Sequence, residues 1–273
     1  MKITEENKEH FESNKKLWNE RTSVHVKSNF YDNEGFLAGK NSLNKIELDE
    51  IGDVKGKSVL HLQCHFGQDT ISFARMGAKA TGVDFSDEAI KNAREMNEKL
   101  GLDAEFINCN VYDLKEHLDK KFDIIFTSYG VIGWLPDLNE WANLINHFLK
   151  PGGVFYIIEF HPVVWMFDDN FERIDYPYFT TAKPIEMVST TTYTDSEKEL
   201  SGIKEFSWNH ALSEVINSLL QSDLKIEFVN EYPFSPYNIF PDMYSGEDGY
   251  WRMKKFGDKL PQLFSIRAVK NRP

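Results

Sequence analysis

The stretch from residue 58 to residue 89 constrains the fold more than any other part of this 273-residue chain. It reads SVLHLQCHFGQDTISFARMGAKATGVDFSDEA. An apolar strand breaks at a tight turn around Gly67, a short helix spans residues 70–76, and a second strand ends on Asp84. In a nucleotide-binding βαβ unit the first turn brings backbone N–H groups to the ligand, and an acid ending the second strand accepts hydrogen bonds from ribose hydroxyls. Asp84 stands where that acid is required.

The same stretch resembles the first motifs of class I S-adenosylmethionine (SAM) dependent methyltransferases. The usual form has an acid on the first strand followed by three glycines. Here His61 replaces the acid, Gln63 and His65 replace the first two glycines, and Gly67 remains. HLQCHFG followed by GVDFS is similar to a bacterial subgroup of small-molecule methyltransferases in which this substitution is normal. The resemblance implies SAM as cofactor, S-adenosylhomocysteine as product, and methyl transfer to a small molecule.

The composition limits which kinds of partner this protein can bind. The formal net charge of −12 argues against a nucleic-acid substrate, because phosphate backbones are bound by clustered Lys and Arg. The N-terminus is acidic and no apolar run is long enough to span a bilayer, so we expect no membrane association and a cytoplasmic location. Two cysteines, Cys64 and Cys109, give no disulfide framework and are expected to be reduced.

Strands and helices alternate along the chain as an α/β fold requires. No composition shift divides the chain into halves, which predicts one domain with elaborations. Ser86 is a suitable N-cap for the helix that follows the second strand. The Pro-Gly-Gly at residues 151–153 is expected to stop a helix before the fifth strand. After the second strand, the expected elements are helix 87–100, strand 104–109, strand 122–128, helix 138–149, strand 154–159, helix 211–221, strand 225–231 and strand 262–269.

The last two strands have no crossover helix between them, so they should pair antiparallel. This argues against an NAD-dependent oxidoreductase, whose nicotinamide-binding domain ends in further parallel units. The resemblance implies a Rossmann-like seven-stranded sheet of order 3-2-1-4-5-7-6. We assign residues 1–50 to an N-terminal helical cap segment and residues 51–273 to the methyltransferase domain, with an aromatic lid insertion at about 162–207.

Two segments outside the sheet are rich in groups that contact ligands. In the N-terminal segment, a helix is expected over residues 5–21, and the resemblance implies that this segment folds over the pocket; an arm packed on the sheet is the alternative reading. An aromatic insertion after the fifth strand would cover the carboxyl ends of the strands, where open α/β sheets bind ligands. A dimer interface is the alternative for the lid, and either segment could support a homo-oligomer. The expected substrate-binding residues are Trp18, Arg21, His25, Tyr31, Trp134 and Trp165.

The cofactor-binding candidates sit at the carboxyl ends of the first four strands. Asn110 stands where methyltransferases usually have an Asp that holds the adenine edge, and its amide can both accept and donate there. The full set is Gln63, Cys64, His65, Gly67, Asp84, Phe85, Asn110, Val111, Ser128 and Tyr129.

His161 is the candidate general base, since it follows Glu159 at the end of the fifth strand and imidazole titrates near neutral pH. A turn histidine that bonds the lid backbone is the alternative, and Tyr129 is the competing base. A base is optional, because alignment of the acceptor alone is worth roughly 7–11 kcal/mol. No metal is expected: His61, Cys64 and His65 lack a fourth ligand at a suitable spacing. A SAM-binding sensor or scaffold without catalysis stays open as a second class of function.

Overall fold

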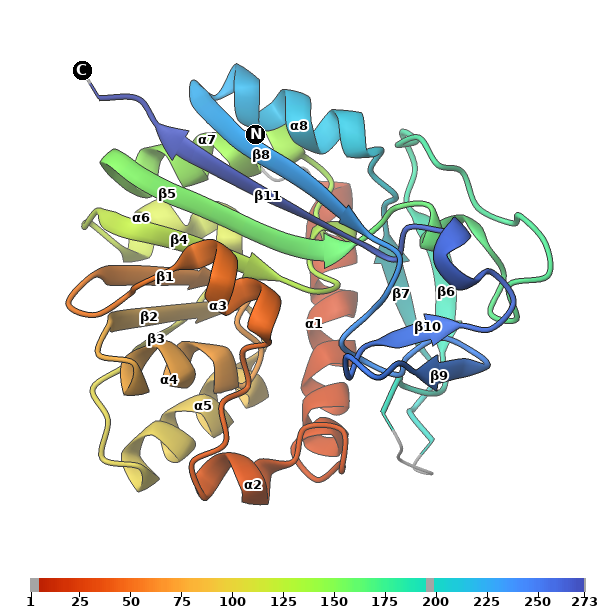
Figure 1. Cartoon of the computed structure of the whole chain (residues 1–273), viewed down its shortest axis with the longest axis horizontal. Helices are drawn as coiled ribbons and strands as arrows, with labels where there is room; N and C mark the ends of the chain where they lie inside the picture. The colour runs from red at the N-terminus through yellow and green to blue at the C-terminus, as the bar shows by residue number, and fades with distance from the viewer. Residues whose placement is uncertain (1–4, 195–198, 273) are drawn as a thin grey trace.

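A seven-stranded sheet of order β3-β2-β1-β4-β5-β11-β8 forms the centre of the computed structural model (Figure 1), which describes residues 5–194 and 199–272. Neighbouring strands from β3 to β5 run parallel, whereas β11 is antiparallel to both β5 and β8. The expected fold class and strand order are therefore confirmed. The strands are β1 (Ser58–Leu62), β2 (Lys79–Asp84), β3 (Glu105–Asn108), β4 (Phe122–Ser128), β5 (Leu149–Phe160), β8 (Leu224–Tyr232) and β11 (Leu263–Lys270).

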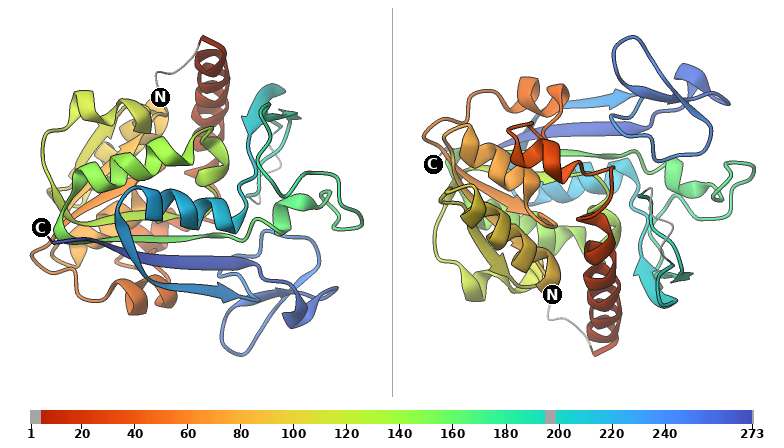
Figure 2. Two further views of the ribbon diagram at one scale, coloured as in Figure 1. Left: turned by 90° about the horizontal axis from the view of Figure 1, so that it is seen from above. Right: turned by 90° about the horizontal axis from the view of Figure 1, so that it is seen from below.

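Helices cover both faces of the sheet (Figure 2), so central strands are apolar on both sides. In β4, Ile124 and Phe126 pack in the cluster that contains α3, α4 and α5, whereas Ile125 packs in the cluster that contains α7 and α8. Ser86 accepts a hydrogen bond from the backbone of Ala89 and caps α5 as expected. These helices are α3 (Lys45–Ile51), α4 (Gln68–Arg75), α5 (Asp87–Lys99), α6 (Leu114–His117), α7 (Leu138–Phe148) and α8 (Leu212–Gln221).

A long helix, α1 (Glu5–His25), crosses the carboxyl ends of the strands (Figure 1). The lid supplies a hairpin of β6 (Ile185–Ser189) and β7 (Ile203–Ser207), and β7 packs along α1. The side chain of Asn14 joins the two, since it donates to the carbonyl of Phe206 (2.8 Å) and accepts from its N–H (2.9 Å). The cap segment and the lid therefore form one continuous cover. A short helix α2 (Asn33–Leu37) and the 3-10 turns η1 (Val111–Asp113), η2 (Ile132–Trp134), η3 (Val164–Met166) and η4 (Gly257–Lys259) complete the connections.

The structure departs from the sequence prediction most clearly at α1, at β5 and in the connection between β8 and β11. Helix α1 continues four residues beyond Arg21, to His25, whose imidazole contacts His65 in the turn after β1. Strand β5 starts at Leu149, so the Pro-Gly-Gly lies within the strand; the β4–β5 register shifts after Phe122 to accommodate it. The long connection between β8 and β11 contains a hairpin of β9 (Met243–Ser245) and β10 (Trp251–Met253), which the sequence analysis did not predict. Within the described ranges, every helix is too short or too polar to span a bilayer.

Candidate functional site

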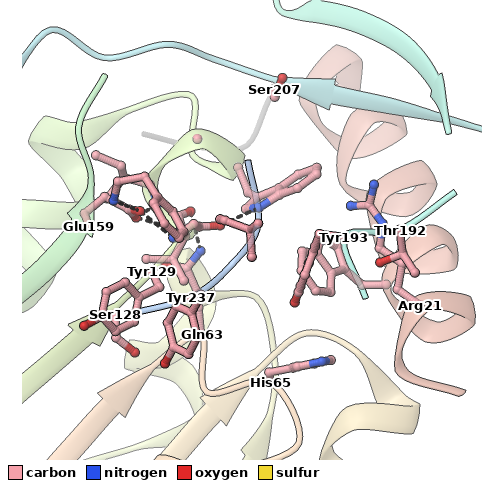
Figure 3. Close-up of a pocket in the computed structure, with 18 of the residues that line it drawn as sticks. Arg21, Gln63, His65, Ser128, Tyr129, Glu159, Thr192, Tyr193, Ser207 and Tyr237 are labelled. Carbon is pink, nitrogen blue, oxygen red and sulfur yellow. Dashed lines mark hydrogen bonds between the residues drawn. The ribbon is translucent and has the colours of Figure 1, made fainter. Parts of the chain in front are cut away.

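A cavity of about 1040 Å³ lies at the carboxyl ends of the strands, beneath α1 and the lid. Figure 3 shows Arg21, Thr192 and Tyr193 on one side of it and Gln63, Ser128, Tyr129, Tyr237 and Glu159 on the other. Sites for one small molecule typically occupy about 300–1,000 Å³. The cavity is therefore large enough for a cofactor and a second small molecule together.

The turn after β1 keeps a backbone shape that usually requires glycine. Gln63 (φ 55°), His65 (φ 50°) and Gly67 (φ 83°) are all left-handed, although only the last is a glycine. Such residues cost about 1–3 kcal/mol each and persist where surrounding contacts fix them. Gln63 Nε2 donates to the carbonyl of Val131 (2.9 Å), and the N–H of His65 donates to Asp84 (2.9 Å). The two substituted positions thus gain side chains in the cavity without losing the glycine-like turn.

Asp84 ends β2 at the cavity wall, as the sequence predicts. One carboxylate oxygen accepts from the N–H of His65 and the other from the N–H of Ser86, both at 2.9 Å. Burial raises the pKa of Asp84 to about 6, against the lowering effect of these hydrogen bonds. A carboxylate has about four acceptor sites, so two remain for ligand hydroxyls. The position fits a ribose.

The end of β3 supplies the neighbouring part of the wall. Asn110 accepts a hydrogen bond from the N–H of Tyr112 (3.1 Å) through its side-chain oxygen, which leaves the amide N–H groups available as donors. Val111 and Phe11 line the same cavity with apolar surface. Apolar surface beside an amide suits a flat heterocycle such as adenine.

Glu159 fixes the turn after β4. Its carboxylate accepts hydrogen bonds from the backbone N–H groups of Val131 (2.8 Å), Phe160 (2.6 Å) and Gly130. Burial raises the pKa of Glu159, and these bonds oppose the rise. The turn includes Tyr129, another left-handed residue (φ 42°), and leads into η2 with Trp134. Glu159 therefore positions the part of the wall that faces the open space of the cavity.

Helix α1 presents Trp18, Arg21 and His25 on one face, at spacings of three and four residues. His25 Nδ1 lies 2.9 Å from His65 Nε2, and its Nε2 lies 2.6 Å from the hydroxyl of Thr192 in the lid. Burial lowers the pKa of His25 to about 2 and that of His65 to about 3, with Arg21 adding to both effects. Both imidazoles are therefore neutral at pH 7.

Arg21 is buried where α1 meets the lid. Its Nη2 donates to Glu205 (2.6 Å) and to the hydroxyl of Ser189 (2.8 Å). The guanidinium carbon lies 5.3 Å from the ring centre of Trp18 and 5.5 Å from that of Trp134. These contacts connect the cap segment, the lid and the turn after β4 around one side of the cavity.

All ten residues predicted to bind the cofactor line the cavity, and so do five of the six predicted to bind substrate: Trp18, Arg21, Tyr31, Trp134 and Trp165. The sixth, His25, is buried behind His65 and contacts the wall through it. Contact of any of these residues with a ligand stays a prediction.

His161 does not face the cavity, contrary to the sequence prediction. Strand β5 ends at Phe160, the N–H of His161 donates to Gln262 in the connection to β11, and the imidazole turns toward β8. Its Nε2 lies 2.8 Å from Glu231 Oε1, and its Nδ1 accepts from the N–H of Val163. Tyr129 does line the cavity, but burial, with Glu47 nearby, raises its pKa well above 10. A phenol in that state is a poor base at neutral pH.

Sequence reasoning missed three groups in the wall. Tyr237 comes from the β8–β11 connection, and Tyr193 comes from the lid, where its hydroxyl lies 2.5 Å from that of Tyr31. Only the three-dimensional structure brings these segments together. Asp69 is different, because it stands in the first turn of α4, directly after the glycine turn. Its position in the motif could have marked it.

The sheet order and the antiparallel β11 are those of a class I methyltransferase fold, and an acid ends β2 beside a large cavity. A family model described as a methyltransferase domain matches residues 53–210, more than half of the chain. The chain belongs to this methyltransferase family, and SAM is its cofactor. The wall residues at Asp84 and Asn110 fit the adenosine part of SAM.

Curated relatives match about half of the chain. An uncharacterized methyltransferase from Synechocystis sp. is 29% identical over 133 residues, which cover 48% of this chain and 60% of the relative. A ubiquinone biosynthesis O-methyltransferase from Pseudomonas syringae is 25% identical over 143 residues, which cover 50% of this chain and 61% of the relative. The chain thus spans about three fifths of the length of these relatives.

Solved structures show the same fold at low sequence identity. A SAM-dependent methyltransferase from Mesorhizobium loti aligns with a TM-score of 0.54 at 17% identity, covering 86% of this chain and 100% of that chain. Another, from Clostridium acetobutylicum, aligns with a TM-score of 0.56 at 13% identity, covering 96% of this chain and 99% of that chain. The second alignment extends over nearly the whole of this chain.

Proposed function

We propose that the protein transfers a methyl group from SAM to a small, partly apolar acceptor, and that it belongs to the methyltransferase subgroup with the HLQCHFG turn. The observation that carries the proposal is the cavity, which continues from the nucleoside positions at Asp84 and Asn110 into an aromatic part under the lid. Two joined parts of different chemistry suit two different molecules. A cofactor site alone, as in a sensor, would not require the second part.

The second part of the cavity is walled by rings from three segments. Phe160, Trp165 and Phe240 form a triangle with ring centres 5.6–6.0 Å apart. Tyr129 and Tyr237 meet edge to face, with centres 5.1 Å apart. Aromatic walls favour flat ligands with apolar surface. The names of several relatives, which are O-methyltransferases of ubiquinone biosynthesis, support a small-molecule acceptor.

The reaction would depend mainly on positioning. SAM, when bound, supplies a methyl group that its sulfonium charge has already activated. Glu159 holds the turn that carries Tyr129 and Trp134, and this turn would align the acceptor. Well-aligned reactants gain roughly 7–11 kcal/mol over free encounter. Because His161 points away and Tyr129 is protonated at pH 7, we assign neither residue the role of a base.

The cap segment and the lid would exclude water from the cavity. Asn14 ties α1 to β7, Asn19 accepts a hydrogen bond from Ser86 at the start of α5 (2.7 Å), and His25 contacts His65. Helix α1 is therefore fixed to the lid on one side and to the turns after β1 and β2 on the other. We assign residues 1–50 to this cap function, as a part of the site.

Calorimetric titration tests the cofactor half of the proposal, with SAM, S-adenosylhomocysteine and NAD as ligands. We expect one SAM or one S-adenosylhomocysteine per chain and no NAD binding. Transfer of labelled methyl groups from SAM to a panel of small aromatic acceptors tests the other half. SAM binding without transfer to any acceptor in a broad panel would favour the sensor or scaffold instead.

A further inference from the structure

Among the residues that the structure describes, seven carboxylates line the cavity, and six of them have an evident role or position. Two are held by backbone N–H groups, namely Asp84 and Glu159. Two are paired with cations, since Lys40 lies 2.9 Å from Asp32 and Arg21 lies 2.6 Å from Glu205. Two more belong to the lid: Asp168 accepts backbone hydrogen bonds, and Asp169 is exposed. The seventh is Asp69 in α4.

Asp69 is the exception. Among residues 5–194 and 199–272, no Lys, Arg or His nitrogen lies within 4 Å of its carboxylate. Its neighbours include two hydroxyl groups: Ser128 donates at 3.4 Å, a long contact, and Ser42, whose hydroxyl bonds to that of Ser72 (2.9 Å), is close enough to lower the pKa of Asp69. Burial raises the pKa of Asp69. Burial is also the main cause that raises the pKa of Tyr31 and Tyr237, and the charge of Asp69 adds to the rise in both. A desolvated carboxylate is costly unless a cation or several donors compensate it.

The position of Asp69 relates it to the cofactor turns. It follows Gly67 by two residues, on the same β1–α4 connection whose His65 N–H donates to Asp84. Its hydroxyl partner Ser128 ends β4, and β4 lies next to β1 in the sheet. If Asp84 at the end of β2 holds the ribose, the attached methionyl arm would extend across β1 toward β4. Asp69 and Ser128 stand where the far end of that arm would lie.

We propose that Asp69, with the hydroxyls of Ser42 and Ser128, binds the α-ammonium group of the methionyl arm of SAM. The inference rests on the proposed function and adds a residue to it. An ammonium group offers three N–H donors, which match one carboxylate and two hydroxyl oxygens. The sulfonium of SAM has no N–H to donate, so it fits this set of acceptors less well.

His61, which stands on β1 where the resembled family has an acid, cannot supply this charge. It is buried, its Nδ1 lies 2.9 Å from the hydroxyl of Thr70, and burial lowers its pKa to about 3. The imidazole is neutral at pH 7 and leaves Asp69 as the nearest uncompensated charge on this connection. The acidic group has thus moved from the strand to the first turn of the following helix.

The test compares three ligands on two proteins by calorimetry: SAM, S-adenosylhomocysteine and 5′-methylthioadenosine, on the wild type and on Asp69→Asn. S-adenosylhomocysteine keeps the ammonium but lacks the sulfonium, and methylthioadenosine lacks both. We expect the Kd of the first two ligands to rise about 10-fold or more in Asp69→Asn, as loss of a charged hydrogen bond gives. The Kd of methylthioadenosine should change less than about 2-fold, which also shows that the site remains folded.

Asp87→Asn is the matched control, because Asp87 is likewise an acid in the first turn of a helix but is exposed and lies outside the cavity wall. It should leave all three affinities unchanged. An equal Kd of S-adenosylhomocysteine for the wild type and Asp69→Asn would overturn the inference, and so would an equal loss for methylthioadenosine. A weakening of SAM alone would assign Asp69 to the sulfonium and would also overturn it. Failure of the wild type to bind S-adenosylhomocysteine would instead refute the proposed function.

Discussion

Glu47 is a buried carboxyl group whose removal should stabilise the protein at neutral pH. It lies in α3, with 1% of its surface exposed. Asn44 donates to one carboxyl oxygen (3.1 Å), and the other oxygen has no hydrogen-bond partner within the described ranges. Burial is the main cause that raises the pKa of Glu47 from 4.5 to about 7. Glu47→Gln would keep the oxygen that accepts from Asn44 and remove the titration.

The direction of the effect follows from proton linkage. Between pH 4.5 and pH 7 the folded state holds a proton on Glu47 that the unfolded state has lost, so the free energy of unfolding falls as pH rises through this range. A pKa difference of about 2.5 units corresponds to a full cost of about 3.4 kcal/mol. Between pH 5 and pH 8 the cost should grow by about 2.5 kcal/mol.

Urea unfolding of the wild type and Glu47→Gln at pH 5, 6, 7 and 8 measures this difference. The variant should gain stability relative to the wild type as pH rises, by about 2.5 kcal/mol over the range. Asp49→Asn is a suitable control, since this exposed acid lies on the same helix and pairs with Lys45. A difference between wild type and Glu47→Gln that stays constant from pH 5 to pH 8 would refute the argument from burial.

Three further substitutions test the site and its supports. Asp84→Ala should weaken S-adenosylhomocysteine binding by about 1.5–3 kcal/mol in calorimetry, the worth of a hydrogen bond to a charged group, and undiminished affinity would remove Asp84 from the site. His161→Ala should leave the rate of methyl transfer within about 3-fold of the wild type, whereas the loss of a general base would lower it by ~10²-fold or more. Gly67→Ala should lower the free energy of unfolding by about 2–4 kcal/mol. The new Cβ would lie 2.7 Å from the ring of Phe106 and 2.9 Å from Ala93, at a left-handed backbone position. Unchanged stability in urea would show that the turn can relax.

The sheet was predictable because its signals are local. Each central strand is a short apolar run, and the β1–α4–β2 unit carries its own turn and its acid at Asp84. The missing crossover helix before β11 identified the antiparallel strand. By contrast, the last turn of α1 depends on contacts such as that of His25 with His65, forty residues away. Helix propensity alone could not place that boundary.

The orientation of His161 differs from the sequence prediction for a specific physical reason. His161 was placed in the cleft because it follows Glu159 at the end of the fifth strand. Strand β5 ends at Phe160, and the next residue turns toward Glu231 on β8. Strand periodicity does not extend into the connection that follows. The aromatic wall could not be predicted for a different reason, since Tyr193 and Tyr237 meet the motif residues only through the tertiary fold.

A crystal structure of the protein with bound S-adenosylhomocysteine tests the central claim most directly. We predict that the ribose hydroxyls bond to Asp84, that adenine lies beside Asn110 and Val111, and that the sulfur faces the aromatic wall at Tyr129. The ligand would then fill one part of the cavity and leave the part under the lid for an acceptor. A nucleoside bound away from Asp84, or a sulfur directed away from that wall, would contradict the account.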